Sequence, residues 1–179
     1  RMKFLSSTLS AILWTNGAMS ELDLKELKEH FADEVIGCEI DFHPKIASTM
    51  DEAVRQAEIG ASSGLVVIAE EQTKGRGRFS RSWISSAKQD LLFSVLLRPD
   101  VGHLRFMNMA ATLATCHAVE QFTNMLVGIK WPNDLRVNGR KIAGILVESS
   151  LVSHVQIGYT VVGIGLNVNS DPSLVSEIA

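Results

Sequence analysis

The most informative segment for the fold is LRVNGRKIAGILV at residues 135–147, because it places two apolar runs on either side of Asn138-Gly139. Asn-Gly between alternating apolar residues is the strongest short-range signal for a two-residue β-hairpin turn. We therefore predict a hairpin with strands at residues 135–137 and 142–147. A short strand at 128–131 is expected before this hairpin, and a further strand at 155–168 after it.

The rest of the chain supplies further strands and the helices. Continuous apolar runs at 65–69 and 91–97 predict buried strands, and residues 35–42 predict one more. Apolar residues at helical spacing predict helices at 21–31, 49–59 and 104–125, the second opened by a capping box at Thr49-Met50-Asp51-Glu52. Weaker signals predict a helix that stops at Asn16-Gly17 and another that begins at Asp171-Pro172. The pattern indicates one α+β domain, with helices packed on a largely antiparallel sheet.

The composition is that of an ordinary globular domain. The chain has 179 residues, of which 46% are apolar and 21% charged. Its net charge of -3 argues against a dedicated nucleic-acid binder, which usually carries a positive excess. Positive charge is instead local, on Lys74, Arg76, Arg78 and Arg81.

The two cysteines and the apolar runs bear on where the protein works. Cys38 and Cys116 match no metal or redox spacing, and two such thiols suit a reducing cytosol. No apolar run approaches the roughly 20 residues of a membrane span. Residues 1–20 do not have the pattern of a secretory signal. We therefore expect a cytoplasmic protein with no membrane segment.

Residues 75–83 read GRGRFSRSW and form a glycine-arginine loop. The glycines let the backbone wrap close to a ligand, and the arginines offer paired donors to phosphate or carboxylate. The loop is neither a Walker A loop, since no Gly-Lys-Ser/Thr follows, nor a good dinucleotide fingerprint, since Ser80 replaces the third glycine. Two readings stay open. In the first, the loop binds an anion and Trp83 stacks on a base; in the second, it is a solvated basic loop, with RNA as one partner of such a loop, and Trp83 is a core residue.

Residues 130–134 read KWPND and place a cation and a carboxylate on one tight turn. Pro132 stiffens the turn, and Asn133 can bond its own backbone. Asp134 can hold Mg²⁺ directly or through water, because magnesium sites use few carboxylates together with phosphates. The alternative is a rigid turn that carries a surface ion pair between Lys130 and Asp134.

Small residues on two later strands leave room for a ligand. Lys141 is followed by Ala143-Gly144, so a ligand can lie against that strand, although a lysine there can also protect a sheet edge from aggregation. Gly163 and Gly165 lie inside a predicted strand, where glycine often marks the close approach of a ligand or of another backbone. Asn167 could then read the edge of a base.

The chain lacks a recognisable nucleophile. It has no Gly-x-Ser-x-Gly elbow, and Cys116 and His117 are neighbours in a helix that point in different directions. Chemistry without a protein nucleophile relies on positioning and charge stabilisation. Adenylation is such a reaction, because a substrate carboxylate attacks the α-phosphate of ATP directly.

Between about residues 40 and 170, these motifs resemble the catalytic domain of biotin protein ligases in order and spacing. The matching segments are Ser48-Thr49, Gln72, Gly75-Arg76-Gly77-Arg78, Trp83, Lys130-Trp131-Pro132-Asn133-Asp134, residues 140–148 and Gly163-Ile164-Gly165-Leu166-Asn167. The resemblance implies a fold related to class II aminoacyl-tRNA synthetases, with a mixed sheet and helices on one side. It also implies two half-reactions: biotin and MgATP give biotinyl-5′-AMP and pyrophosphate, and a lysine of a biotin carboxyl carrier domain then attacks the acyl-adenylate.

The resemblance assigns roles by position in the motifs. It implies that biotin is bound by Ser48, Thr49, Met50, Gln72, Arg76, Gly77, Arg78, Lys141 and Gly144. It implies that ATP is bound by Arg76, Arg78, Arg81, Trp83, Lys130, Asn133 and Asn167. Asp134 would hold the metal, and Lys130, Lys141 and Arg78 would stabilise the transition state. Two positions depart from the family pattern: Met50 replaces a common Asn, and Ser80 replaces a frequent Gly.

The same resemblance sets expectations for domains and partners. Residues 1–34 are expected to form an N-terminal helical extension without a winged helix-turn-helix domain, so no DNA partner is expected. Residues 35–179 are expected to form a C-terminally incomplete catalytic domain that lacks the usual C-terminal β-barrel domain. A homodimer is left open. The alternatives are a lipoate–protein ligase, against which the Gly-Arg-Gly-Arg and Lys-Trp-Pro-Asn-Asp motifs favour biotin, and a non-catalytic biotin-binding module.

Overall fold

The computed structural model describes residues 22–153 and 156–169. Its helices are α1 (Leu24–Phe31), α2 (Thr49–Glu58) and α3 (Leu104–Thr123), with short 3₁₀ turns η1 (Arg78–Ser80) and η2 (Val101–His103). Its strands are β1 (Ile40–His43), β2 (Val66–Ala69), β3 (Gly75–Arg76), β4 (Ser82–Trp83), β5 (Asp90–Leu97), β6 (Gly128–Lys130), β7 (Asp134–Val137), β8 (Arg140–Ser153) and β9 (Gln156–Asn167).

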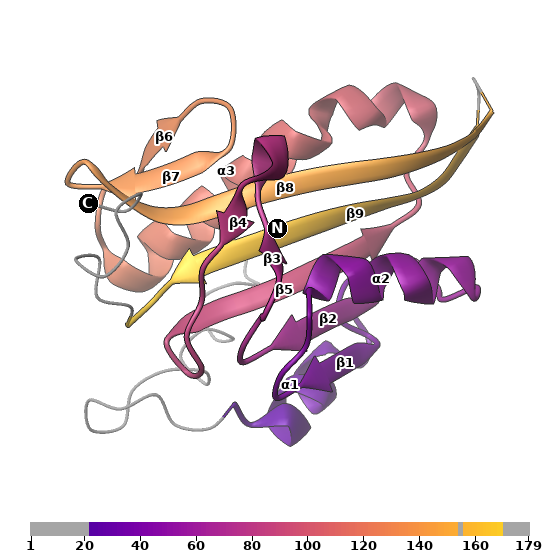
Figure 1. Cartoon of the computed structure of the whole chain (residues 1–179), viewed down its shortest axis with the longest axis horizontal. Helices are drawn as coiled ribbons and strands as arrows, with labels where there is room; N and C mark the ends of the chain where they lie inside the picture. The colour runs from indigo at the N-terminus through magenta and orange to yellow at the C-terminus, as the bar shows by residue number, and fades with distance from the viewer. Residues whose placement is uncertain (1–21, 154–155, 170–179) are drawn as a thin grey trace.

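Within the described residues, seven strands form one open sheet in the order β1-β2-β5-β9-β8-β7-β6 (Figure 1). Only β1 and β2 pair in parallel; the other neighbours in this sheet are antiparallel. The predicted Asn138-Gly139 hairpin is confirmed, since Val137 pairs with Arg140 across it. The expected α+β class, with a mixed and largely antiparallel sheet flanked by helices, is also confirmed.

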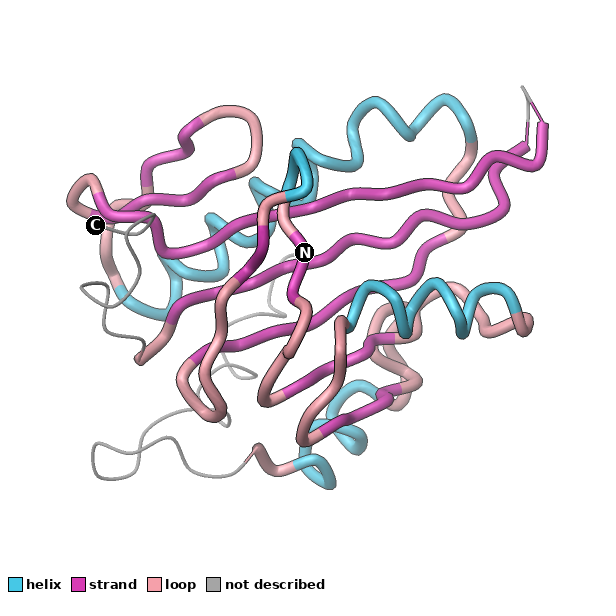
Figure 2. Tube along the Cα trace, viewed as in Figure 1, coloured by secondary structure: helices cyan, strands magenta, loops and turns pink. Residues whose placement is uncertain are grey.

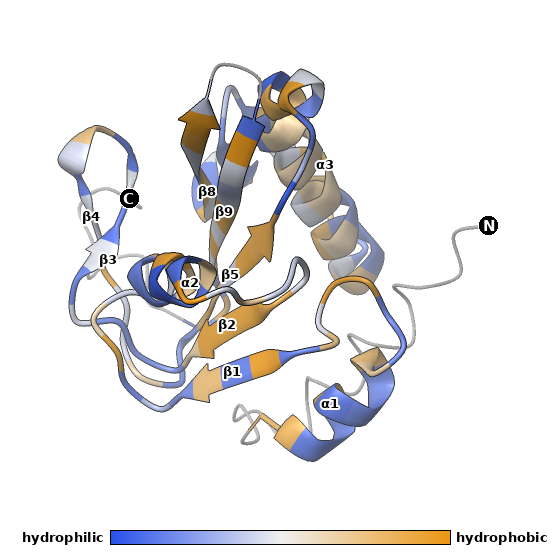
Figure 3. Ribbon diagram, turned by 90° about the vertical axis from the view of Figure 1, so that its right-hand side faces the viewer, coloured by the Kyte–Doolittle hydropathy of each residue, from blue (hydrophilic) through white to orange (hydrophobic). Residues whose placement is uncertain are grey.

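Helices cover both faces of the sheet (Figure 3), so the expectation of helices on one side was wrong. α2 packs on β2, β5 and β9, while α3 packs on the opposite face, against β6, β7 and β8. The reason is that both faces of the central strands are apolar. Val66 and Ile68 belong to one buried cluster together with Leu27 of α1, whereas Val67 belongs to another with Met50 of α2.

The small β3–β4 hairpin lies in front of β8 and β9, on the same face as α2 (Figures 1 and 2). It is formed by the glycine-arginine segment at residues 75–83, which the sequence predicted to be a loop. At the other end of α2, the Arg98 guanidinium donates hydrogen bonds to the carbonyl oxygens of Ala57, Ala61 and Gly158. This arginine therefore joins the C-terminal end of α2 to β9.

Several predicted boundaries differ from the structure. The first strand begins at Ile40 rather than at residue 35, because residues 32–39 form turns and bends. α1 begins after Asp23, whose carboxylate accepts hydrogen bonds from the amides of Lys25 and Glu26. The helices predicted at Asn16-Gly17 and Asp171-Pro172 lie outside the described residues. No helix in the described part of the chain combines the length and apolarity that a bilayer span needs.

Candidate active site

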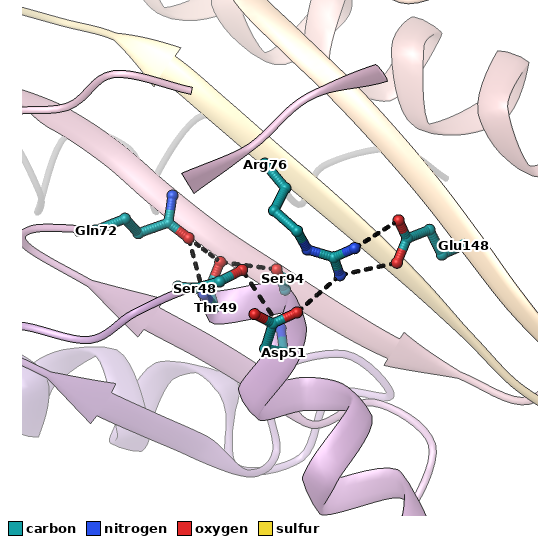
Figure 4. Close-up of polar contacts among 7 residues, drawn as sticks. All are labelled: Ser48, Thr49, Asp51, Gln72, Arg76, Ser94 and Glu148. Atoms are coloured by element: carbon teal, nitrogen blue, oxygen red, sulfur yellow. Dashed lines mark hydrogen bonds and ion pairs between the residues drawn. The ribbon is translucent and has the colours of Figure 1, made fainter. Parts of the chain in front are cut away.

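A network of uncharged polar groups lies at the start of α2 and is here called the neutral network: the buried Ser48, Thr49 and Ser94, and the half-buried Gln72 (Figure 4). The amide and hydroxyl of Thr49 donate to Oε1 of Gln72 at 2.7 and 3.0 Å. The Thr49 and Ser94 hydroxyl oxygens are 2.8 Å apart. Because Thr49 gives its single hydroxyl proton to Gln72, Ser94 must donate to Thr49. The network thus fixes the N-terminus of α2 to β5 and to the segment after β2.

The predicted capping box is wrong by one residue. Ser48 caps α2, since its Oγ accepts from the Asp51 amide at 3.4 Å, and Thr49 is already helical. Thr49 is therefore free to bond Gln72 and Ser94. Glu52 does not reach back to the cap; its carboxylate binds Arg55 and Gln56. Propensity could not separate Ser48 from Thr49, because both residue types are good caps.

Three glycines, here called the glycine floor, let side chains lie flat against the sheet: Gly144, Gly163 and Gly165. A Cβ at Gly165 would lie 2.5 Å from the Trp83 ring, and one at Gly144 would lie 2.7 Å from it. A Cβ at Gly163 would lie 2.7 Å from Sδ of Met50. The sequence predicted room for a ligand at Gly144 and the close approach of a ligand or backbone at Gly163 and Gly165; in this structure the groups that approach them are side chains of the chain itself.

Two buried polar atoms beside this floor have no hydrogen-bond partner in the described part of the chain: Nε1 of Trp83 and Oδ1 of Asn167. The amide nitrogen of Asn167 donates to the Lys141 carbonyl oxygen at 3.3 Å. A buried polar atom without a partner costs free energy. One donor and one acceptor are therefore available here to a bound polar ligand.

Lys141 and Arg78 are held by side chains of the 130–134 turn. Nζ of Lys141 is 2.9 Å from Oδ1 of Asp134 and 5.3 Å from the centroid of the Trp83 ring. Nη1 of Arg78 donates to Oδ1 of Asn133 at 3.1 Å. Asn133 bonds not to its own turn but to β8, through its side chain and main chain to Ile145. The turn is thereby fixed to the sheet.

Arg76 is held by two carboxylates, and we call the three residues the Arg76 clamp (Figure 4). Nη1 and Nη2 donate to the two oxygens of Glu148 at 2.9 and 2.8 Å. Nη2 also lies 2.9 Å from Oδ1 of Asp51. The clamp joins β3 to β8 and to α2, and so ties the hairpin to the body of the domain.

These groups surround two adjoining pockets. The first is lined by Ser48, Thr49, Met50, Gln72, Arg76, Gly77, Arg78, Trp83, Asn133, Lys141, Gly144, Ile145, Leu146, Gly163, Ile164 and Gly165. The second is lined by Gly77, Arg78, Phe79, Arg81, Ser82, Trp83, Ile84, Asn133, Asp134 and Lys141. Trp83, Arg78, Asn133 and Lys141 stand between the two.

Nearly all of the site residues expected from the sequence line one of these pockets. Two do not. Asn167, at the end of β9, is tied to Lys141 through its side-chain amide. Lys130 is exposed on the edge strand β6, where it is paired with Asp134 in the ladder, while the Asp134 carboxylate pairs with Lys141. Facing positions share one side of a sheet, so Lys130 lies at the rim of the second pocket.

Three residues of this site had no predicted role: Ser94, Asp51 and Glu148. Ser94 carried a usable signal, because it is the one polar residue in the apolar run at 91–97. Asp51 and Glu148 carried none. Their common partner, Arg76, lies far from both in the sequence, and exposed carboxylates are common.

A candidate metal-binding group consists of Asp41, His43 and Glu52, whose potential ligand atoms all lie within 4.8 Å of one another. These groups already have partners. Nε2 of His43 is 2.9 Å from Asp41, and hydrogen bonds from Arg55 hold the pKa of the Glu52 carboxyl below its usual value.

Burial raises the pKa of the Cys116 thiol, which lies on α3, across the sheet from the pockets. Cys116 is therefore a structural thiol and not an activated nucleophile.

The chain has clear relatives among known proteins. The profile of the biotin/lipoate A/B protein ligase family matches residues 43–167. The bifunctional ligase/repressor BirA of Bacillus subtilis is 34% identical over 88% of this chain and 48% of its own length. The biotin–[acetyl-CoA-carboxylase] ligase of Mycobacterium tuberculosis is 35% identical over 82% of this chain and 58% of its own length.

A solved structure points to the same family. The biotin protein ligase of Aquifex aeolicus, in complex with biotin and ATP, superposes with a TM-score of 0.63 and 32% identity, covering 78% of this chain and 56% of that one. The chain thus spans about half the length of the curated relatives it matches. With the family profile matched from His43 to Asn167, across both pockets, the chain belongs to the biotin/lipoate A/B protein ligase family.

Proposed function

We propose that this chain activates biotin with ATP to biotinyl-5′-AMP and passes the biotinyl group to a lysine of a biotin carboxyl carrier domain. The observation that carries the proposal is that the neutral network, the glycine floor and four cationic side chains meet around two adjoining pockets; the cations are Arg76, Arg78, Arg81 and Lys141. The relatives support it, since the Aquifex aeolicus structure holds biotin and ATP and a Leishmania major ligase structure holds biotinyl-5-AMP. The relatives described above are biotin ligases, and nothing in the site favours lipoate.

The chemistry follows from charge and position. A carboxylate oxygen of biotin attacks the α-phosphorus of ATP, the bond to pyrophosphate breaks, and an acyl-adenylate forms. Negative charge shifts onto the phosphate oxygens in that step, and Lys141 and Arg78 are placed between the two pockets to stabilise it. In the second step the carrier amine attacks the acyl carbon and AMP leaves. No protein nucleophile is needed in either step.

The remaining roles are assigned by the character of each region. The neutral network and Met50 suit the uncharged ring of biotin, because buried hydroxyl and amide groups match urea-type donors and acceptors. Trp83 and Asn167 suit adenine, since an indole face and two unpartnered polar atoms lie together there. Arg76, Arg81 and Lys130 add positive charge around the phosphates.

Mg²⁺ fits this arrangement at Asp134. Magnesium is usually held by one or two carboxylates together with substrate phosphates, and Asp134 lines the pocket that contains Arg78 and Lys141. When bound there, the ion would neutralise phosphate charge. Asp134 would hold it, and Asn133 would keep the turn fixed to β8 through Ile145.

The experiment is mass spectrometry of the chain incubated with MgATP and biotin, and separately with MgATP and lipoate. Biotinyl-5′-AMP in the first mixture, with no adenylate in the second, is the expected result. Equal adenylate formation from lipoate would overturn the choice of substrate. Tight biotin binding in calorimetry without any adenylate would instead indicate a non-catalytic biotin-binding module. Transfer is then tested by adding a purified biotin carboxyl carrier domain and measuring the gain in its mass.

A further inference from the structure

We propose that Glu148, assisted by Asp51, tunes the affinity of the site for the substrate carboxylate: it occupies the Arg76 guanidinium in place of that carboxylate and gives it up when the acid binds. This inference rests on the proposed function. It deepens that function by naming the carboxylate of the chain that competes with the acid for Arg76.

The first step of the argument is the geometry of the Arg76 clamp. Two nearly equal bonds of 2.9 and 2.8 Å join the guanidinium to both oxygens of Glu148. This fork-to-fork pairing is also the way in which an arginine binds a free carboxylate ligand. The part of Arg76 that would recognise an acid is therefore occupied by an acid of the chain.

The second step is the charge of the clamp. Arg76 contacts two carboxylates, Glu148 and Asp51, so the group as a whole carries one negative charge in excess. If a substrate carboxylate takes the place of Glu148, the number of charges around the guanidinium and the type of its hydrogen bonds do not change. A ligand without charge cannot make that exchange on equal terms, since an ionised acceptor binds a guanidinium more strongly than a neutral one.

The third step is position. Arg76 lines the first pocket, whereas neither Asp51 nor Glu148 does. Each carboxylate lies just outside, since Asp51 is two residues from the lining residue Thr49 and Glu148 two residues from Leu146. Arg76 thus stands between the pocket and its own carboxylates.

The fourth step is accessibility. The side chains of Arg76, Asp51 and Glu148 are 37%, 56% and 40% exposed, so water reaches all three. Ion pairs this exposed contribute little to stability and can open. Exchange is therefore feasible at Arg76. The Lys141–Asp134 pair, with side chains only 24% and 22% exposed, is less open to it.

The test measures binding of biotin and of biotinol, in which a hydroxymethyl group replaces the carboxylate, by calorimetry. Glu148→Gln keeps the shape and one acceptor but removes the competing charge. We expect it to tighten biotin binding by about two- to fivefold, the range that an exposed ion pair can supply, and to leave biotinol binding unchanged. Asp51→Asn, which removes one contact instead of two, should act in the same direction and less.

Two further variants separate exchange from a merely structural role. Glu29→Gln, which removes an exposed carboxylate paired with Lys25 on α1, is the matched control and should change neither affinity. In an Arg76→Gln background, Glu148→Gln should have no further effect on the preference for biotin over biotinol. Thermal midpoints are recorded for all variants, so that a loss of folding is recognised.

The outcomes are distinct. A higher ratio of biotin to biotinol affinity in Glu148→Gln supports the exchange. An equal change for both ligands, or an unchanged ratio, overturns it and makes the clamp a structural tie for the hairpin. Failure of the unaltered chain to bind either ligand overturns the proposed function itself. If Glu148→Gln does not fold, the ratio measured for Asp51→Asn decides in the same way.

Discussion

The two walls of the first pocket are built differently. Three of the four residues of the neutral network are almost fully buried, with Ser48, Thr49 and Ser94 at 1%, 3% and 0% exposure; Gln72 is half-buried, and the contacts of the network join uncharged groups. The Arg76 clamp on the other wall is more than a third exposed, and its contacts join full charges. Desolvation explains the division, because a buried hydroxyl needs one good partner, whereas a buried charge is costly even when paired.

This difference indicates what each wall can do. The neutral network needs no rearrangement to present its shape, so it is preorganised for a rigid uncharged ring. The charged wall consists of contacts that a ligand anion can replace. A ligand with a neutral ring at one end and an acid at the other matches both walls. That division can be tested by substitutions in each part of the site.

Lys141→Ala should slow adenylate formation by about 10²–10³-fold, because it removes a donor aimed at charge that develops in the transition state. Lys141 contacts Asp134 at 2.9 Å and lines both pockets. The measurement is the single-turnover rate of pyrophosphate release with saturating biotin and MgATP. Lys28→Ala, on the last turn of α1, is the control and should react at the normal rate. An unchanged single-turnover rate for Lys141→Ala would show that Lys141 does not stabilise the transition state.

Gly165→Ala should lower the free energy of unfolding by about 1–3 kcal/mol, the usual cost of overpacking. The new methyl group would lie 2.5 Å from the Trp83 ring, which must then leave the glycine floor. Gly128→Ala is the matched control in the same sheet, since its nearest neighbour would be an ordinary 3.6 Å away. Urea unfolding of the two variants gives the comparison. Equal stability of the two variants would mean that the Trp83 ring can move off the glycine floor to a second position of similar free energy.

Much of the fold could be predicted from the sequence, because its signals are local. The Asn138-Gly139 turn, the apolar runs of β2 and β5 and the helical pattern of α3 each lie within one segment. The parts that failed depend on tertiary contacts. The sequence could not show that the Thr49 hydroxyl bonds Gln72 and Ser94 instead of capping its own helix. It also could not show that helices cover both faces of the sheet.

The site divides in the same way. Its cations and glycines were predicted from motifs, and the structure gathers most of them around two pockets. The anions that hold these cations were missed, because an ion pair between Arg76 and Glu148 spans 72 residues and leaves no pattern in either segment. The motifs therefore predicted the residues expected to contact a ligand, but not the carboxylates that hold those side chains in place when no ligand is bound.

Thr49→Val should lower the free energy of unfolding by about 1–2 kcal/mol, because it leaves the buried Ser94 hydroxyl without its Thr49 partner and removes one of the two hydrogen bonds to Oε1 of Gln72. The loss should be the same in 0.1 and 1 M salt, since no charge is involved. Denaturant unfolding at both salt concentrations measures it. In the double variant Thr49→Val/Ser94→Ala, part of the loss should be recovered, since one orphaned hydroxyl is gone. A strong salt dependence would contradict the uncharged character of this wall.

Arg55→Gln should have the smallest effect on stability. The pH dependence of that effect shows how little an exposed charge on α2 contributes to the thermal midpoint. Hydrogen bonds from Arg55 lower the pKa of Glu52 from 4.5, so the unfolded chain binds the proton more readily than the folded one. The contribution of this pair is therefore fully present above that pH and is lost as the pH falls through the lowered pKa. The difference in thermal midpoint between the variant and the unaltered chain should be small at neutral pH, should shrink in 1 M salt, and should disappear in acid. A difference that persists in acid would show that Arg55 acts through packing, and that the start of α2 owes its stability to more than the neutral network.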